Sequence, residues 1–72
     1  IVVTGHTDTT GEPAQNDDLS RRRAQQIRQM LVSRGFPAAR IEAVGRGQRD
    51  LAVATGPNVD EARNRRVTVE VR

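Results

Sequence analysis

The sequence predicts an α+β domain in which one helix packs on one face of a small mixed sheet. Apolar residues recur at helical spacing between residues 16 and 34, and within residues 65–72 polar and apolar side chains alternate from Arg66 onward. A short apolar segment also opens the chain. At 72 residues, the chain is expected to form one domain, 1–72.

The first predicted strand is the apolar segment at residues 1–4, and a polar loop with Gly5, Gly11 and Pro13 follows over residues 5–15. Because the chain opens inside a predicted strand, we expect it to be part of a longer protein. One helix and three strands make a poor core. We therefore expect that an N-terminal strand and helix, which would complete the sheet and the core, are missing.

The helix is predicted over residues 16–34. Asn16 is a favourable N-cap, and the two aspartates after it suit the positive end of the helix dipole. Gly35 can end the helix in a left-handed conformation, and Pro37 prevents its continuation. The apolar sector of this helix consists of Leu19, Ala24, Ile27, Met30 and Leu31.

Two further strands are predicted after the helix. Residues 40–44 make a short strand, and residues 65–72 have the pattern of a half-buried strand. A glycine-containing loop at residues 45–58 separates them, and residues 60–63 add one helical turn. The order strand, helix, strand, strand defines the α+β class.

Composition argues against several functions. All 12 basic residues are arginine, and the net charge is +3. Nucleic-acid binding is not expected, because Phe36 is the sole aromatic residue and nine acidic residues lie among the arginines. No apolar run approaches the roughly 20 residues that span a bilayer. Contact with a membrane is therefore expected only through parts outside this chain.

Two arginines occupy positions where apolar side chains are expected. Arg23 falls inside the apolar sector of the helix, four residues from both Leu19 and Ile27. Arg65 has the parity of the valines in the last strand. The Arg23 stem could lie across core surface with its charge in water, and strand pairing could begin only at residue 66. Alternatively, both arginines line an anion site, with Asp8 as the counter-charge.

Several short motifs occur in a characteristic order: GHTD at 5–8, Gly11, Asn16, LS at 19–20, RA at 23–24 and NRRV at 64–67. In order and spacing they resemble the OmpA C-terminal-like peptidoglycan-binding domain family. The resemblance extends over nearly the whole chain. The sequence departs from the family pattern at Gln48, where the family has glutamate, and in the segment 51–62.

The resemblance implies non-covalent binding of peptidoglycan through the diaminopimelate of its stem peptide, which would anchor an outer-membrane or envelope protein to the cell wall. It implies that Asp8 and Arg23 are the paired ligand-binding residues, with Asn16 and Arg65 around the same site. Asp8 can accept from the ligand ammonium, and Arg23 can bind the carboxylate with two hydrogen bonds. Thr10 is a further candidate contact. The resemblance also implies the periplasmic face of the outer membrane of a Gram-negative bacterium.

Catalysis, metal binding and a cofactor are not expected. His6 and Asp8 could supply two metal ligands, but a catalytic zinc usually takes three and the chain has no second histidine. His6, Ser20 and Asp8 could be imagined as a nucleophile set, yet no nucleophile elbow surrounds Ser20. Asn64 is expected to hold its loop rather than to bind a ligand.

The alternative function is an assembly module that associates with another protein chain, or with a second copy as a homodimer, through an exposed sheet edge. Protection by diaminopimelate-containing muropeptide but not by lysine-type muropeptide would favour wall binding. Concentration-dependent association without a response to ligand would favour assembly.

Overall fold

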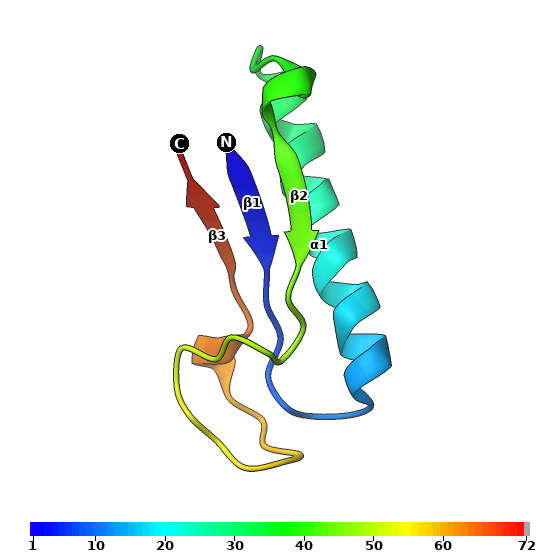
Figure 1. Cartoon of the computed structure of the whole chain (residues 1–72), viewed down its shortest axis with the longest axis vertical. Coiled ribbons are helices and arrows are strands. Elements are labelled where there is room, and N and C mark those ends of the chain that lie inside the picture. Colours follow the sequence, from blue (N-terminus) through cyan, green and yellow to red (C-terminus); the bar gives the residue numbers. More distant parts are fainter. Residues whose placement is uncertain (72) are drawn as a thin grey trace.

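The computed structural model, which describes residues 1–71, contains a three-stranded mixed sheet with one long helix packed on one face (Figure 1). The strands are β1 (Val2–Gly5), β2 (Glu42–Gly45) and β3 (Val67–Glu70), in the spatial order β2-β1-β3. β1 pairs with β2 in parallel and with β3 antiparallel. The predicted α+β class and the order of elements are confirmed.

The last two strands are shorter than predicted. β2 begins at Glu42 instead of residue 40, because Ala38–Arg40 form a 3₁₀ turn. β3 begins at Val67, so Arg65 precedes the paired segment and its parity does not set its position relative to the core. The predicted end of this strand, position 72, lies outside the described residues.

The helix α1 (Pro13–Ser33) begins three residues earlier than predicted. Pro13 occupies its first turn, where the fixed φ of proline is favourable and its missing N–H would have no helical partner. Glu12 is the N-cap and makes no side-chain capping bond. The predicted N-cap role of Asn16 is therefore wrong, and the two aspartates after it lie beyond a first turn that has no acidic residue.

The C-terminal end of α1 confirms the prediction. Gly35 adopts a φ of 101°, in the left-handed region that favours glycine. The N–H of Gly35 donates to the carbonyl of Val32, and the N–H of Phe36 donates to the carbonyl of Leu31, both at 3.1 Å. This pair of bonds is a Schellman motif, which satisfies carbonyls that the helix itself leaves unbonded.

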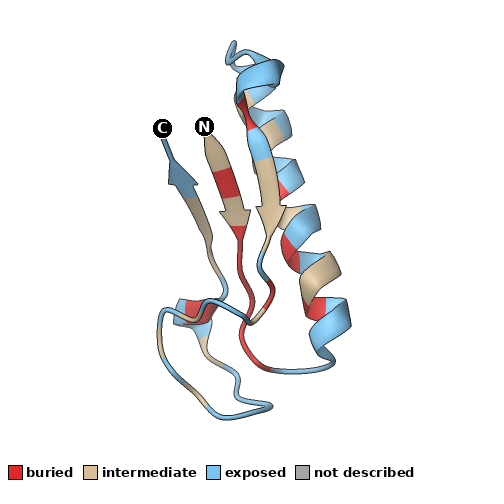
Figure 2. Ribbon diagram, in the orientation of Figure 1, coloured by how far each residue is buried: buried red, intermediate tan, exposed pale blue. Residues whose placement is uncertain are grey.

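The core lies between α1 and the strands β1 and β2. Its buried centre is Val3, Ala24 and Ile41, and Figure 2 shows buried segments on both the sheet and the helix. Leu19 and Met30 were predicted to belong to the apolar sector of the helix, but they are 41% and 49% exposed. That part of the prediction is wrong. α1 packs against β1 and β2, and the flank of the helix that holds these two side chains is not covered.

The loops that follow β1 and β2, the start of α1 and the segment before β3 all meet at one end of the molecule, opposite the two chain termini (Figure 1). Two glycines allow the helix to approach the strand ends closely. A Cβ atom on Gly5 would lie 2.0 Å from the backbone oxygen of Ser20, and one on Gly45 would lie 2.6 Å from the backbone nitrogen of Arg21. Within residues 1–71, the structure has no helix whose apolar length would reach across a bilayer.

Candidate functional site

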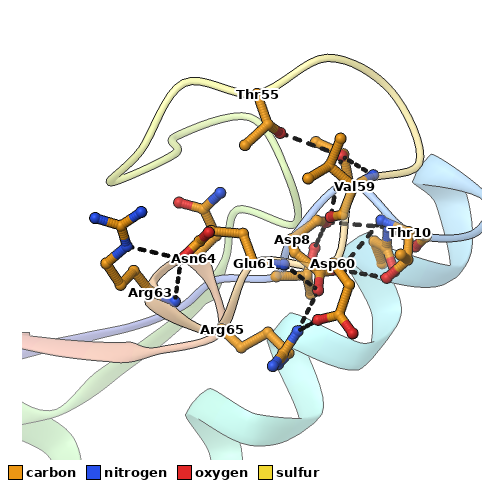
Figure 3. Close-up of polar contacts among 12 residues, drawn as sticks. Asp8, Thr10, Thr55, Val59, Asp60, Glu61, Arg63, Asn64 and Arg65 are labelled. Atoms are coloured by element: carbon orange, nitrogen blue, oxygen red, sulfur yellow. Dashed lines mark hydrogen bonds and ion pairs between the residues drawn. The ribbon is translucent and has the colours of Figure 1, made fainter.

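Asp8, three residues beyond the end of β1, is the centre of a polar cluster (Figure 3). The residue is only 4% exposed. Its Oδ1 accepts hydrogen bonds from the hydroxyl and, at 3.1 Å, from the N–H of Thr10. Its Oδ2 accepts from the N–H of Glu61 at 3.3 Å and from Nη1 of Arg65 at 2.5 Å. Each carboxylate oxygen therefore has two donors, which uses its two lone pairs.

These donors keep Asp8 ionised. The pKa of Asp8 is lowered from 3.8 to about 2, chiefly by the Thr10 hydroxyl, with further contributions from Arg65 and from the backbone N–H groups of Thr10 and Glu61. Burial acts in the opposite direction, because it disfavours the charged form. Asp8 is thus a fixed negative charge over the whole physiological pH range.

Arg65 bridges two carboxylates. Besides Asp8 it forms an ion pair with Asp60, whose side chain is 79% exposed. Arg65 follows directly after the 3₁₀ turn Ala62–Asn64, which is the helical turn that the sequence predicted at residues 60–63. Sequence reasoning does not find Asp60, since its only signal is an acidic residue shortly before Arg65.

Thr9 and Asn64 tie the long loop before β3 to the rest of this cluster. The Thr9 hydroxyl donates to the carbonyl of Gly56 at 2.8 Å and accepts from the N–H of Val59 at 2.9 Å. The side-chain amide of Asn64, fully buried, bonds both the N–H and the carbonyl of Val53, at 2.9 and 3.0 Å. The prediction that Asn64 holds its loop is confirmed.

Asn16 connects the start of α1 to the same loops. Its buried amide donates to the carbonyl of Thr10 at 2.9 Å and to Oε1 of Gln48 at 3.0 Å. Gln48 is the position at which the sequence departs from the expected glutamate. An open groove of about 720 Å³ adjoins Thr10 and Asn16 and extends along the outer surface of α1 as far as Arg22.

Arg23 lies on α1 and is half-buried. In the described part of the chain it makes no hydrogen bond and no ion pair. Helical geometry places Arg23 on the flank that includes Leu19, whereas Arg28, on the other flank, donates to the carbonyl of Ile41 just before β2. The structure therefore brings together four of the five predicted site residues, Asp8, Thr10, Asn16 and Arg65. The fifth, Arg23, has no hydrogen bond or ion pair with any of them, and it does not border the groove next to Thr10 and Asn16.

His6 and Ser20 do not join Asp8. The Ser20 hydroxyl is fully buried, donates to the carbonyl of Asp17 at 2.8 Å and accepts from the N–H of Gly47 at 2.8 Å. Nε2 of His6 lies 3.3 Å from the hydroxyl of Thr68 on β3. Among residues 1–71, no group of three or more histidine, cysteine, aspartate or glutamate side chains is arranged to hold a metal ion.

The fold and the site define a class of protein: a small α+β domain with strand, helix, strand, strand order and an acid–arginine cluster on the loops at one end of its sheet. The model of the OmpA family matches residues 1–65, and the chain belongs to this family. The predicted family is thereby confirmed.

Curated relatives match nearly the whole chain. It is 41% identical over 71 residues to the outer membrane porin F of Pseudomonas fluorescens, with 99% of this chain and 22% of that protein covered. It is 43% identical over 70 residues to outer membrane protein A of Yersinia pseudotuberculosis, with 97% of this chain and 19% of that protein covered. The corresponding protein of Shimwellia blattae is 39% identical over 70 residues, with 97% and 28% covered. The chain thus spans less than a third of the length of these relatives.

Proposed function

We propose that this domain binds peptidoglycan through the diaminopimelate of the stem peptide and thereby anchors an outer-membrane or envelope protein to the cell wall, from the periplasmic side. Membership of the OmpA family and relatives named as outer membrane proteins support an envelope role. The observation that supports the ligand is the buried, ionised carboxylate of Asp8 paired with Arg65, which suits a group that has both an ammonium and a carboxylate.

Binding at Asp8 requires an exchange of partners. Because all lone pairs of the carboxylate are used, an ammonium can bond Asp8 only if a present donor leaves. Arg65 is the donor that can leave, since its side chain is 37% exposed and its second partner, Asp60, faces solvent. The ligand ammonium takes its place at Oδ2, and the released guanidinium is free to turn toward the ligand carboxylate.

Arg23 completes this account as the second carboxylate ligand. Its guanidinium has no hydrogen bond or ion pair among the described residues, so binding a carboxylate breaks no existing bond. The planar guanidinium can donate two parallel hydrogen bonds to one carboxylate. Asn16 and Thr10 border the groove of about 720 Å³, which offers space for the rest of the stem peptide.

Arg23 is also the better residue for a test, because replacing Asp8 removes bonds that hold the loops together. We expect Arg23→Gln to lose co-sedimentation with purified diaminopimelate-type peptidoglycan while keeping its circular dichroism spectrum. Loss of one partner of a desolvated charge pair costs about 2 kcal/mol or more, which is roughly a 30-fold loss of affinity. The control is Arg21→Gln, an exposed arginine on the other flank of the same helix. If Arg23→Gln binds as well as Arg21→Gln, the proposal is wrong.

A second candidate function is association with another chain through the edge of β3. β3 has a strand neighbour on one side, β1, and Val69 and Val71 are 52% and 82% exposed. An exposed edge with apolar side chains favours pairing with another strand. Sedimentation equilibrium over a range of protein concentrations tests this function. It predicts a dimer that Val69→Lys abolishes and that peptidoglycan fragments do not affect.

A further inference from the structure

Side chains on the sheet face opposite α1 form three rows that run across the strands. Each row has one central residue, from the β1 segment, and one from each neighbouring segment, that of β2 and that of β3. The acidic, neutral and basic rows are, in order along β1, Glu42, Val2 and Glu70; Val44, Thr4 and Thr68; and Arg46, His6 and Arg66. The third row lies just beyond the paired segments, where the N–H of Arg46 donates to the carbonyl of Gly5 and the N–H of His6 donates to the carbonyl of Arg66. This face is therefore acidic at one end and basic at the other.

The rows line a groove of about 240 Å³, separate from the Asp8 cluster. Eight of the nine side chains border it directly, together with Asp50. The ninth side chain, Arg66, does not border the groove. Its Nη2 donates a hydrogen bond at 3.2 Å to the backbone carbonyl of Asp50, which does border it. In the middle of the groove, Thr4 and Thr68 present hydroxyl groups.

At the basic end, Nη1 of Arg66 is buried and has no hydrogen-bond partner among the described residues, and Nδ1 of His6, a residue only 2% exposed, has none except the nearby backbone of Asp50. Buried polar atoms without a partner are uncommon and call for an explanation such as a ligand. Arg46, Arg66 and Asp50 together leave this end with one net positive charge. Arg66 does not border the groove, so a carboxylate seated over His6 supplies the missing acceptor only if the Arg66 side chain turns toward it.

We propose that this groove binds a short, extended, zwitterionic peptide, with its terminal ammonium at Glu42 and Glu70 and its terminal carboxylate at Arg46 and Arg66. The acidic and basic rows are four residues apart on the β2 side, which corresponds to about 13 Å. An extended peptide of about four residues has the same length. Its main-chain groups can bond the threonine hydroxyls of the neutral row. The proposal is independent of the Asp8 site, because it requires no diaminopimelate.

A second copy of the chain fits this face less well. The charges on this face would pair with those of a second copy turned by 180°. However, three strands over a length of about 13 Å offer a contact area of only roughly 200 Å². A stable interface takes about 800 Å² from each partner. The groove is of a size for a small ligand.

The test is a titration of the ¹⁵N-labelled chain with tetraalanine, up to about 10 mM, followed by amide chemical shifts in NMR spectra. We expect saturable shifts at Thr4, His6 and Thr68, and none at Thr10. Acetylating the peptide amino group or amidating its carboxyl group should each weaken binding. Arg46→Gln and Glu42→Gln should each weaken it roughly threefold or more, whereas Arg34→Gln at the exposed end of α1 should have no effect.

Three results would overturn the proposal. One is the absence of shifts on this face. Another is equal binding of the doubly capped peptide, because the charged rows would then have no role. The third is a set of shifts on this face that depends on protein concentration without any peptide, which would identify a second copy as the occupant. Because tetraalanine lacks diaminopimelate, failure here leaves the peptidoglycan proposal unaffected.

Discussion

Replacing Asp8 with asparagine tests how much the buried carboxylate stabilises the loops at this end of the sheet. Asparagine keeps the shape of the side chain but removes the charge. It also places an amide group opposite the donors from Thr10, Glu61 and Arg65. We expect the variant to fold and to be less stable than the wild type at neutral pH.

The magnitude follows from the pKa of Asp8, which is lowered from 3.8 to about 2 in the folded chain. Such a difference corresponds to about 2 kcal/mol of stability. Because the folded-state pKa is the lower one, this stability is present above pH 3.8 and is lost as the pH falls through 2. The wild type should therefore exceed Asp8→Asn by about 2 kcal/mol at pH 6 and by only about 0.5 kcal/mol at pH 2.

The assay is urea unfolding followed by far-ultraviolet circular dichroism, since the chain has no tryptophan or tyrosine to report by fluorescence. Other carboxyl groups titrate in the same range, but those that share no partner with Asp8 contribute equally to both proteins and cancel in the difference. Asp60→Asn is the matched control: it shares Arg65 with Asp8 but is 79% exposed. An exposed ion pair contributes little, about 1 kcal/mol at most. A wild-type advantage over Asp8→Asn that is the same at pH 2 and pH 6 would refute the reasoning.

Two further predictions concern neighbouring positions. Gly5→Ala should destabilise the domain by about 3 kcal/mol or more, because the new Cβ would meet the backbone oxygen of Ser20 at 2.0 Å. The control Gly56→Ala, where a Cβ would have no atom within 4 Å, should be nearly neutral. Urea unfolding compares the two variants, and equal unfolding midpoints would show that the helix can move away. Thr10→Val should raise the pKa of Asp8 toward 3.8, because the hydrogen bond from the Thr10 hydroxyl is the largest cause of its lowering. Titration of the Asp8 carboxyl ¹³C resonance by NMR measures this pKa, and an unchanged value near 2 would contradict the prediction.

Features governed by neighbours in the sequence were predictable. The alternating valines before the C-terminus predict β3, and Gly35 followed by Pro37 predicts the end of α1 to within one residue. Asn64 was correctly expected to hold its loop. The start of α1 was misjudged because Asn16 has the chemistry of an N-cap, and only the packed structure shows that its amide is directed toward the neighbouring loops instead.

By itself, the sequence determined the fold class, the order of elements, the OmpA family and the choice of Asp8 and two arginines as unusual charges. These depend on periodicity, turn residues and motif spacing, all of which are local along the chain. Only the tertiary structure decided which arginine meets Asp8, because Arg65 lies 57 residues away and reaches it through the antiparallel pairing of β3 with β1. The same register decided that acidic and basic residues from three strands gather in separate rows, since a shift of one residue would turn each of those side chains to the other face of the sheet.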